Sequence, residues 1–395
     1  MQYRKDKQGN ELSILGYGCM RFTNKNGKID LEKAEREILT AYQNGVNYYD
    51  TAYIYPGSEE ALGIILEKNN IRDKVNIATK LPQYMINSAN ALDKYFNEEL
   101  KRLRTDHIDY YLMHHLTDYV QWDRLKKLGI ESWIKDKKEK GLIKNIGFSY
   151  HGNSELFIKI LNDYKWDFAQ IQYNYLDENS QAGKLGVKEA EKLNIPIIIM
   201  EPLRGGKLVN MLPEKAKTLI KNNKRHYSAA EWSFRWLYNQ KAVTVVLSGM
   251  NSIQMVNENC EIASSAKEDS FTNEDYELIN QIIEEIRKTE KIACTGCRYC
   301  MPCVKGIDIP GLFAAYNRMY SESKTSGRAQ YAQAVALRKD VNYASACIKC
   351  GKCEAHCPQS IPIREKIIEA DKALSPLPIK IAINILKTFM LREAK

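Results

Sequence analysis

The sequence predicts an α/β protein: a (β/α)8 TIM barrel followed by a small, mainly helical ferredoxin-like domain with two four-cysteine motifs. Three observations lead to this prediction. Short β-rich runs alternate with amphipathic helical stretches eight times before residue 265, as a closed barrel of eight strand–helix units requires. Eight of the ten cysteines lie beyond residue 290. The length of 395 residues suits one large and one small domain.

The strand candidates are rich in apolar residues, as expected of parallel strands that helices cover. They are residues 14–20, 46–51, 75–80, 108–114, 143–149, 168–174, 195–200 and 243–249. The helical candidates show apolar residues at helical spacing, and several follow a capping Asp, Ser or Asn. They are residues 31–44, 58–69, 88–104, 123–140, 154–164, 182–193, 228–238 and 252–263. An open doubly wound sheet is the alternative, but eight regular units favour closure.

Further elements flank the barrel. A hairpin that turns at residues 8–10 is expected to cover its bottom. Beyond the barrel, helices are expected at residues 273–288, 310–320 and 329–339. The predicted division of the chain is a barrel at 1–270, a linking helix at 271–290, a ferredoxin-type domain at 291–370 and an amphipathic helix at 371–395. That last helix is expected to pack on its own protein, with docking on a membrane surface or a subunit as the alternative.

Charge and composition exclude several classes of protein. With 44% hydrophobic residues the chain can fill a core, and no apolar run is long enough for a membrane span. The N-terminus lacks the apolar region of a signal peptide, so a cytoplasmic location is expected. Residues 291–395 hold 17 Lys and Arg against 8 Asp and Glu, a net charge of 17 − 8 = +9. No nucleic-acid-binding module accompanies this charge, and bound metal clusters would offset it.

The strand ends deliver a set of residues suited to proton transfer. Strand 46–51 ends in Asp50, with Tyr55 soon after it, and the next two strands end in Lys80 and His114. In a barrel of this kind the chemistry lies at the C-terminal ends of the strands. An ammonium favours the phenolate and so is expected to lower the pKa of a nearby tyrosine, while an aspartate can hold the ammonium charged. The four residues together predict an active site.

At these residues the sequence resembles the aldo-keto reductase family. The motifs are Asn47-Tyr-Tyr-Asp-Thr-Ala-Tyr-Ile-Tyr-Pro-Gly-Ser-Glu, Ile77-Ala-Thr-Lys, Asp109-Tyr-Tyr-Leu-Met-His, Ile146-Gly-Phe-Ser, Gln170-Ile-Gln-Tyr-Asn, Pro202-Leu-Arg-Gly-Gly and Leu247-Ser-Gly-Met. The resemblance covers roughly residues 10–265 and implies NAD(P)H-dependent reduction of an aldehyde or ketone, or the reverse alcohol oxidation. It implies Tyr55 as general acid, tuned by Lys80 and Asp50, and His114, rather than His115, as the residue that orients the carbonyl.

The resemblance also implies the residues that bind the nicotinamide cofactor. They are Ser149 and Gln172 at the nicotinamide amide, Met200 where an aromatic usually stacks, Pro202, Leu203, Gly205, Ser248, Gly249 and Met250 at the phosphate corner, and Glu258 and Asn259 on the adenine side. Met255 stands where an arginine would often bind the 2′-phosphate of NADP, so NAD is expected and NADP stays open. The smaller Met200 leaves room for a flavin, which no motif supports. The run from Gly16 to Arg21 lacks the third glycine of a Rossmann fingerprint.

Two cysteine runs predict two [4Fe–4S] clusters. The second run fits C-x2-C-x2-C-x3-C-P and the first nearly does. Because the first three cysteines of each run suit one cluster, the fourth is expected to bind the other. This assigns Cys294, Cys297, Cys300 and Cys357 to one cluster and Cys347, Cys350, Cys353 and Cys303 to the second. Zinc bound by the same cysteines is the alternative to iron–sulfur clusters. This part resembles the ferredoxin-type domain fused behind some bacterial aldo-keto reductases.

The sequence therefore predicts an oxidoreductase that acts on a small carbonyl or alcohol substrate, with clusters for electron transfer or structural support. A redox partner protein is a further expectation. The alternative is a non-catalytic nicotinamide-sensing or electron-transfer module on the same scaffold. Hydride transfer moves two electrons together whereas a cluster accepts one, and the sequence shows no group that converts between them.

Overall fold

The computed structural model describes residues 1–288, 290–294, 296, 298–339, 341–357 and 359–391. Eight parallel strands form a closed barrel, in which each strand pairs with its neighbours in chain order and the last pairs with the first. They are β3 (Leu15–Gly18), β6 (Tyr48–Asp50), β7 (Asn76–Leu81), β8 (Ile108–Leu116), β9 (Ile143–Tyr150), β10 (Phe168–Gln172), β11 (Ile197–Met200) and β12 (Val243–Ser248). The predicted barrel is confirmed, and the open sheet is not formed.

An N-terminal hairpin covers one end of the barrel, as its turn sequence predicts. Strands β1 (Tyr3–Lys5) and β2 (Glu11–Ser13) pair antiparallel. Leu12 packs into the barrel interior among residues such as Phe168 and Val245. The Tyr110 hydroxyl, which also belongs to the interior, donates to the Asp6 carboxylate at 2.6 Å. The hairpin therefore fixes this end of the barrel through both apolar and polar contacts.

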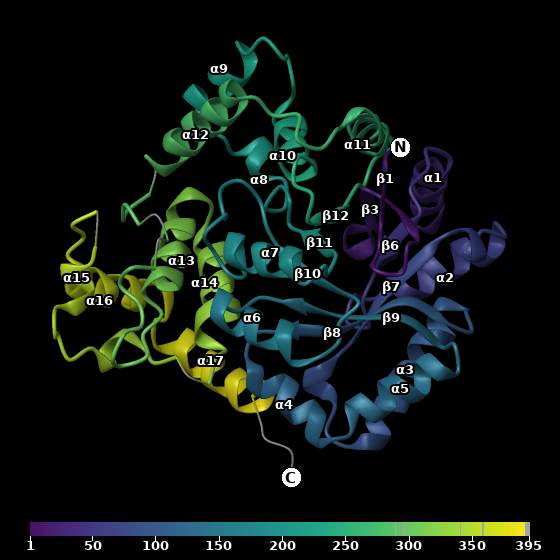
Figure 1. The fold of residues 1–395 in the computed structure, drawn as a ribbon, viewed down its shortest axis with the longest axis horizontal. Coiled ribbons are helices and arrows are strands. Elements are labelled where there is room, and N and C mark those ends of the chain that lie inside the picture. The colour runs from purple at the N-terminus through teal and green to yellow at the C-terminus, as the bar shows by residue number, and fades with distance from the viewer. Residues whose placement is uncertain (289, 295, 297, 340, 358, 392–395) are drawn as a thin grey trace.

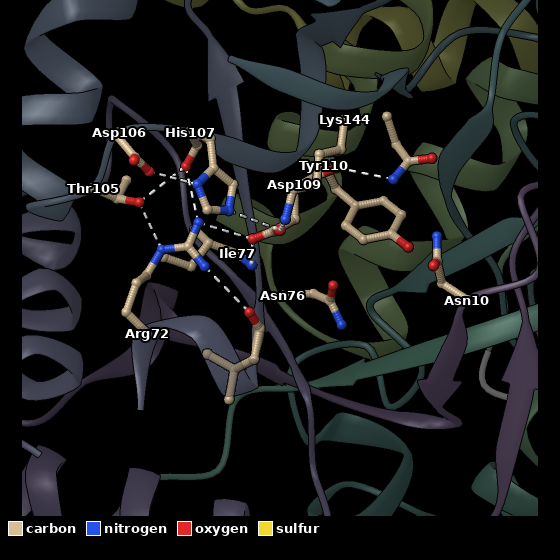
Figure 2. Close-up of polar contacts among 12 residues, drawn as sticks. Asn10, Arg72, Asn76, Ile77, Thr105, Asp106, His107, Asp109, Tyr110 and Lys144 are labelled. Atoms are coloured by element: carbon tan, nitrogen blue, oxygen red, sulfur yellow. Dashed lines mark hydrogen bonds and ion pairs between the residues drawn. The ribbon is translucent and has the colours of Figure 1, made fainter. Parts of the chain in front are cut away.

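A buried ion-pair cluster lies at the start of β8, at the end of the strand opposite His114 (Figure 2). The Asp109 carboxylate accepts from the Ile77 backbone N–H and from Lys144, both at 2.9 Å. It also pairs with Arg72 at 3.0 Å and lies 3.4 Å from His107. Burial opposes ionisation of Asp109, but these donors and cations outweigh it and hold its pKa well below the usual range. The cluster ties β7, β8 and β9 together.

Helices surround the barrel, as Figure 1 shows. They include α1 (Leu31–Gln43), α2 (Ser58–Lys68), α3 (Ala89–Leu103), α6 (Ser154–Asp163), α7 (Gly183–Lys192), α8 (Lys207–Asn210), α9 (Glu214–Lys221), α10 (Ala229–Tyr238) and α11 (Ile253–Ser265). The single helix expected at 123–140 is instead two helices, α4 (Tyr119–Lys127) and α5 (Ile130–Glu139). Gly129 separates them with a φ of 82°, and a capping box on Asp118 starts α4 early.

The C-terminal part packs around a second hydrophobic core beside the barrel (Figure 1). Its helices are α13 (Ile309–Ser321), α14 (Lys324–Tyr331), the short α15 (Lys352–Ala355), α16 (Ile363–Leu374) and α17 (Leu377–Met390). The helix expected at 329–339 begins earlier, at a Ser323 cap, and continues as a π-helical turn over Ala332–Ala336. The linking helix, α12 (Asn273–Arg287), packs in the barrel's own hydrophobic cluster. The domain limits drawn from the sequence stay a prediction.

The C-terminal part lies against the loops at the C-terminal ends of the strands. Glu322, which directly follows α13, forms ion pairs with Arg204, at 3.2 Å, and with Lys207. Arg298 pairs with Glu155 of α6 at 2.8 Å. The cysteine-rich part is therefore fixed over the end of the barrel where the sequence places the chemistry.

In the described part of the chain no single helix is both long and apolar enough to cross a membrane. Helices α16 and α17 meet the requirement only as a pair, and they are bent by 84° relative to each other.

Candidate active site and cysteine sites

Three strand ends bring the four predicted catalytic residues together. The Lys80 ammonium of β7 donates to the Asp50 carboxylate of β6 and to the Thr51 carbonyl, both at 2.6 Å. It lies 5.3 Å from the centre of the Tyr55 ring. The rings of Tyr55 and His114 meet edge to face, with centroids 6.1 Å apart. The four residues therefore form one constellation, in which a buried ion pair lies beside a phenol and an imidazole.

Burial controls the protonation of this site. Burial raises the pKa of Tyr55, and the nearby Lys80 ammonium opposes the rise without cancelling it. The net direction is thus opposite to the lowering expected from the sequence, because the sequence cannot weigh burial against charge. Burial alone would lower the pKa of Lys80, but the negative charges of Asp50 and Tyr55 outweigh burial, and the net pKa of Lys80 is raised. At neutral pH the site therefore holds a protonated phenol beside a charged ammonium.

His114 is a neutral imidazole in this environment. Burial holds its pKa well below the usual range, and Lys80 and the neighbouring histidines His115 and His151 add to that lowering. Its Nδ1 has no hydrogen-bond partner among the described residues. A neutral imidazole with one nitrogen protonated can donate a single hydrogen bond, which suits the orientation of a carbonyl oxygen.

A polar network that the sequence did not predict continues from His114. The rings of His115 and His151 lie 4.8 Å apart, and His151 Nδ1 is 3.2 Å from the Gln181 side-chain oxygen. Gln181 in turn donates to the side chain of Gln172, whose amide donates to Asp177 at 2.6 Å. Gln172 was expected at the nicotinamide amide, but His151, Gln181 and Asp177 stand in no recognisable motif, so only the fold could join them to it.

The predicted nicotinamide residues lie around the same end of the barrel. Ser149 is buried, and its hydroxyl accepts from the His115 backbone N–H at 2.8 Å. Asn259 donates to the Ser248 hydroxyl at 3.1 Å. Met200 packs against the residues of the barrel interior. Three of the polar side chains assigned to the cofactor, Ser149, Ser248 and Asn259, therefore also brace neighbouring segments of the barrel.

The remaining predicted cofactor residues lie after β11, after β12 and on α11. Pro202, Leu203 and Gly205 follow β11, and Gly249 and Met250 follow β12. The Met250 carbonyl accepts from the Tyr17 hydroxyl at 2.6 Å. Glu258 lies on α11 and accepts from Gln254 at 2.8 Å.

Arg21 is a residue of this corner that the sequence reasoning missed. An added Cβ at Gly249 would lie 2.8 Å from Arg21 Cδ, and one at Gly205 would lie 3.0 Å from its guanidinium. The exposed guanidinium pairs with no acidic residue among those described. Two further cations of this corner are already paired: Arg204 with Asp177 and Glu322, and Lys207 with Glu322. The two glycine loops and Arg21 thus form a cradle that fits an anionic group.

The described cysteines of the two runs line two open cavities in the C-terminal part. Cys294, Cys300 and Cys357 line one of about 330 Å³ with its open mouth, beside apolar neighbours such as Phe313 and Ile361. The other, of about 430 Å³ with its open mouth, is lined by Cys303, Cys347, Cys350 and Cys353, which come mostly from the second run, and by Cys300. Cys297 lies outside the described residues. No group of three or more His, Cys, Asp and Glu among the described residues is arranged for a single metal ion.

The two cysteine groups differ in their surroundings. Cys294 also lines a larger cavity, of about 800 Å³ with its open mouth, which the barrel residues Asp177, Gln181 and Arg204 share. In the other group of cysteines, Cys350 is exposed to solvent. The group of Cys294 therefore faces the barrel end that carries the four predicted catalytic residues, and the group of Cys350 faces outward.

The fold and the site place the protein among the oxidoreductases that are built on a (β/α)8 barrel. The profile of the Aldo/keto reductase family matches residues 14–284, and that of a 4Fe-4S dicluster domain matches residues 293–361. The chain belongs to the aldo-keto reductase family and carries a C-terminal 4Fe-4S domain.

Similar proteins agree with this assignment. An aldo-keto reductase of Gibberella moniliformis is 25% identical over 73% of this chain and 94% of its own length. An uncharacterised oxidoreductase of Bacillus subtilis, YqkF, is 25% identical over 67% of this chain and 92% of its own.

Two solved structures share the barrel fold. The aldo-keto reductase AKR11C1 of Bacillus halodurans superposes with a TM-score of 0.60 at 24% identity, over 71% of this chain and 96% of its own. An aldo-keto reductase of Klebsiella pneumoniae in complex with NADPH superposes with a TM-score of 0.59 at 18% identity, over 72% of this chain and 96% of its own.

Proposed function

We propose that the protein interconverts a carbonyl compound and its alcohol with a nicotinamide cofactor. The observation that carries this proposal is the buried Lys80–Asp50 ion pair, with N···O at 2.6 Å, beside Tyr55 and His114. In the reducing direction Tyr55 gives its phenolic proton to the carbonyl oxygen, and the Lys80 charge stabilises the phenolate that remains. His114 donates a hydrogen bond that aims the carbonyl. The bound nicotinamide supplies the hydride.

The cofactor site we propose uses the cradle at Gly205 and Gly249. Backbone without side chains permits close approach of a pyrophosphate, and Arg21 supplies the matching positive charge. Ser149 and Gln172 would hold the nicotinamide amide, and Met200 would lie against its ring. Met255, which is 47% exposed at the start of α11, offers no charge to a 2′-phosphate. We therefore propose NAD(H) as a cofactor at least as suitable as NADP(H).

We further propose two [4Fe–4S] clusters in the C-terminal part. Cys294, Cys297, Cys300 and Cys357 would hold one and Cys303, Cys347, Cys350 and Cys353 the other. Thiolates are the ligands these clusters need, and the grouping of the described thiols around two cavities supports this assignment. The position of Cys294 toward the barrel, with Cys350 exposed, favours electron transfer to or from a redox partner over a purely structural role.

An activity screen on anaerobically purified protein tests the proposal. NADH and NADPH would each be offered with a panel of aldehydes and ketones, and nicotinamide oxidation would be followed at 340 nm. We expect turnover of at least one carbonyl compound, with loss of turnover in Tyr55→Phe. Nicotinamide binding without turnover of any member of the panel would instead favour a sensing module. Failure to bind either nicotinamide would contradict the proposal.

A further inference from the structure

The loop that follows β11, residues 201–206, has a strained backbone. Glu201 and Arg204 have φ values of 55° and 47° although neither is a glycine, and Gly205 and Gly206 follow at 70° and 90°. A residue with a Cβ is disfavoured at positive φ and persists there where the surrounding structure holds it. Gly205 also belongs to the cradle proposed for the pyrophosphate. We call residues 201–206 the cradle loop.

The groups that hold the cradle loop come from the C-terminal part. The Glu322 carboxylate, whose side chain is 3% exposed, pairs with Arg204 at 3.2 Å and with Lys207, which directly follows the loop. Arg318 pairs with Glu322 at 3.0 Å and with Glu201 at 3.6 Å. The first and the fourth residue of the loop and the residue after it are therefore all bound to Glu322 or to its partner Arg318.

Glu322 makes these contacts as a carboxylate. Burial alone would raise its pKa, but the neighbouring cations, first Arg204 and then Arg318, outweigh burial and lower the net pKa. The side chain is therefore ionised at neutral pH. Asp177 also pairs with Arg204, and Glu201 with Arg318. Without the charge of Glu322, these two carboxylates would face three cations, and the buried Arg204 would lose part of its counter-charge.

The same anchor reaches the residue assigned to the nicotinamide amide. Arg204 pairs through its Nη1 with Glu322 and through its Nε with Asp177, at 3.0 Å. Asp177 accepts from the Gln172 amide at 2.6 Å and from Asn174 at 3.0 Å. Only 7% of the Arg204 side chain is exposed, so these contacts are shielded from solvent. Through Arg204, Glu322 is therefore connected both to the cradle loop and to Gln172.

We propose that Glu322 is a positioning residue, by which the C-terminal part holds the cradle loop and Gln172 in the geometry that binds the nicotinamide cofactor. This inference rests on the proposed function, because the cofactor is the one proposed there. A loop that is held in advance binds its ligand without the entropic cost of ordering it. Proton transfer depends on Tyr55 and Lys80, which come from other strands. Glu322 should therefore affect nicotinamide affinity far more than kcat.

Glu322→Gln in the full-length, cluster-loaded protein tests this inference, because glutamine keeps the shape and removes the charge. NADH affinity would be measured by fluorescence titration without a carbonyl compound, and hydrogen–deuterium exchange would follow the cradle loop. Ser326→Ala is a milder second variant, since it removes a hydrogen bond to Glu322 and leaves the ion pairs in place. Asp371→Asn is the matched control, because the partners of this carboxylate, Tyr331 and Ser375, lie within the C-terminal part. Circular dichroism and iron content verify that each variant folds.

We expect Glu322→Gln to weaken NADH binding about tenfold, as coupling between two sites commonly does, and to speed hydrogen exchange in the cradle loop. Ser326→Ala should weaken NADH binding about two- to threefold, as loss of one hydrogen bond does. Asp371→Asn should match the wild type in both measurements. With a carbonyl substrate, the KM for nicotinamide should rise in Glu322→Gln, while kcat at saturating cofactor stays within about twofold of the wild type.

Wild-type NADH affinity, or wild-type exchange of the cradle loop, in a folded Glu322→Gln variant would overturn this inference and leave the proposed function intact. An equal loss of affinity in Asp371→Asn would also overturn it, since the effect would then reflect general destabilisation of the C-terminal part. If Glu322→Gln does not fold, Ser326→Ala decides, and wild-type affinity in that variant refutes the inference. Wild-type protein that binds no nicotinamide would contradict the proposed function and this inference with it.

Discussion

Replacement of Tyr55 by phenylalanine is the most direct test of the proposed chemistry. The ring meets His114 edge to face and lies beside Lys80, and phenylalanine preserves the shape that makes these contacts. The pKa of Tyr55 responds to burial and to nearby charges, first that of Lys80, and to no side-chain hydrogen bond, so loss of the hydroxyl breaks no such bond. The variant should therefore fold with wild-type stability and bind nicotinamide as before. Only the transferable proton is removed.

The expected loss follows from the role of that proton. General acid catalysis contributes about 10²- to 10⁴-fold, and a hundredfold loss corresponds to about 2.7 kcal/mol of transition-state stabilisation. Because burial raises the pKa of Tyr55, the phenol stays protonated through the neutral range. Carbonyl reduction should therefore be flat between pH 6 and 8 and should decline only as alkaline pH deprotonates the phenol. No transition near the ordinary histidine pKa is expected, because His114 stays neutral there.

Steady-state kinetics with a carbonyl substrate, together with nicotinamide titration by fluorescence, would measure both quantities. Tyr53→Phe is the matched control, since Tyr53 lies in the same loop but packs against Tyr95 and Arg102. The control should keep at least half of the wild-type kcat. If Tyr55→Phe retained wild-type turnover while the protein remained folded, the assignment of Asp50, Tyr55, Lys80 and His114 as the catalytic residues would be wrong. A parallel loss of nicotinamide affinity would indicate that the ring positions the cofactor.

Three further predictions concern stability, cofactor and metal. Asp109→Asn should reduce the free energy of unfolding by about 3 kcal/mol, as urea denaturation would measure, because it removes the buried counter-charge of Arg72, whose side chain is only 12% exposed. Asp106→Asn, whose side chain is 93% exposed, should change stability by less than about 0.5 kcal/mol. Since the folded state lowers the pKa of Asp109, this contribution should be present above the unfolded pKa of about 3.9 and be lost as the pH falls below it; a wild-type-like acid profile in Asp109→Asn would refute that. Arg21→Ala should weaken NAD and NADP equally, by about tenfold, since a pyrophosphate contact is common to both, whereas tenfold tighter binding of NADP by the wild type would contradict the inference from Met255. The anaerobic protein should contain about eight iron and eight sulfide per chain, and about four iron in the wild type, or bound zinc, would contradict two clusters. Cys357→Ala should disturb the cluster of Cys294 and Cys300, and Cys303→Ala should disturb the other cluster.

The sequence predicted the barrel well because its evidence is local and repeated. Each strand is a short apolar run beside an amphipathic helix, so an error in one unit leaves the other seven to define the fold. The mistakes occurred where one residue decides the backbone. Gly129 divides α4 from α5 by adopting a positive φ, and the Ser323 cap starts α14 well before residue 329. Such positions have no periodicity that would reveal them.

The candidate site shows the same division between local and spatial information. Asp50, Lys80 and His114 could be brought together in advance because they end neighbouring strands, whose order follows from the barrel. Arg21 could not, because its role depends on its contact with glycines that lie more than 180 positions away in the sequence. The net pKa shift of Tyr55 was equally inaccessible, since it depends on how much protein surrounds the ring as well as on the one charge beside it.

The grouping of the cysteines was predictable from the sequence only in part. Short spacings can bring three thiols of a run to one cavity, but whether the fourth returns to it depends on the direction of the chain after the third. In the structure Cys357 lines the cavity of Cys294 and Cys300, while Cys303 lines the cavity of the second run. Cys300 lines both cavities, so the two sites adjoin each other. Loss of Cys357 should nevertheless disturb mainly the cluster of Cys294 and Cys300, and loss of Cys303 mainly the cluster of the second run. Either arrangement loses one cluster in each variant, so the spectrum of the surviving cluster separates them: by electron paramagnetic resonance, Cys357→Ala should match Cys294→Ala if the fourth ligands are exchanged, and Cys347→Ala if each run binds its own cluster.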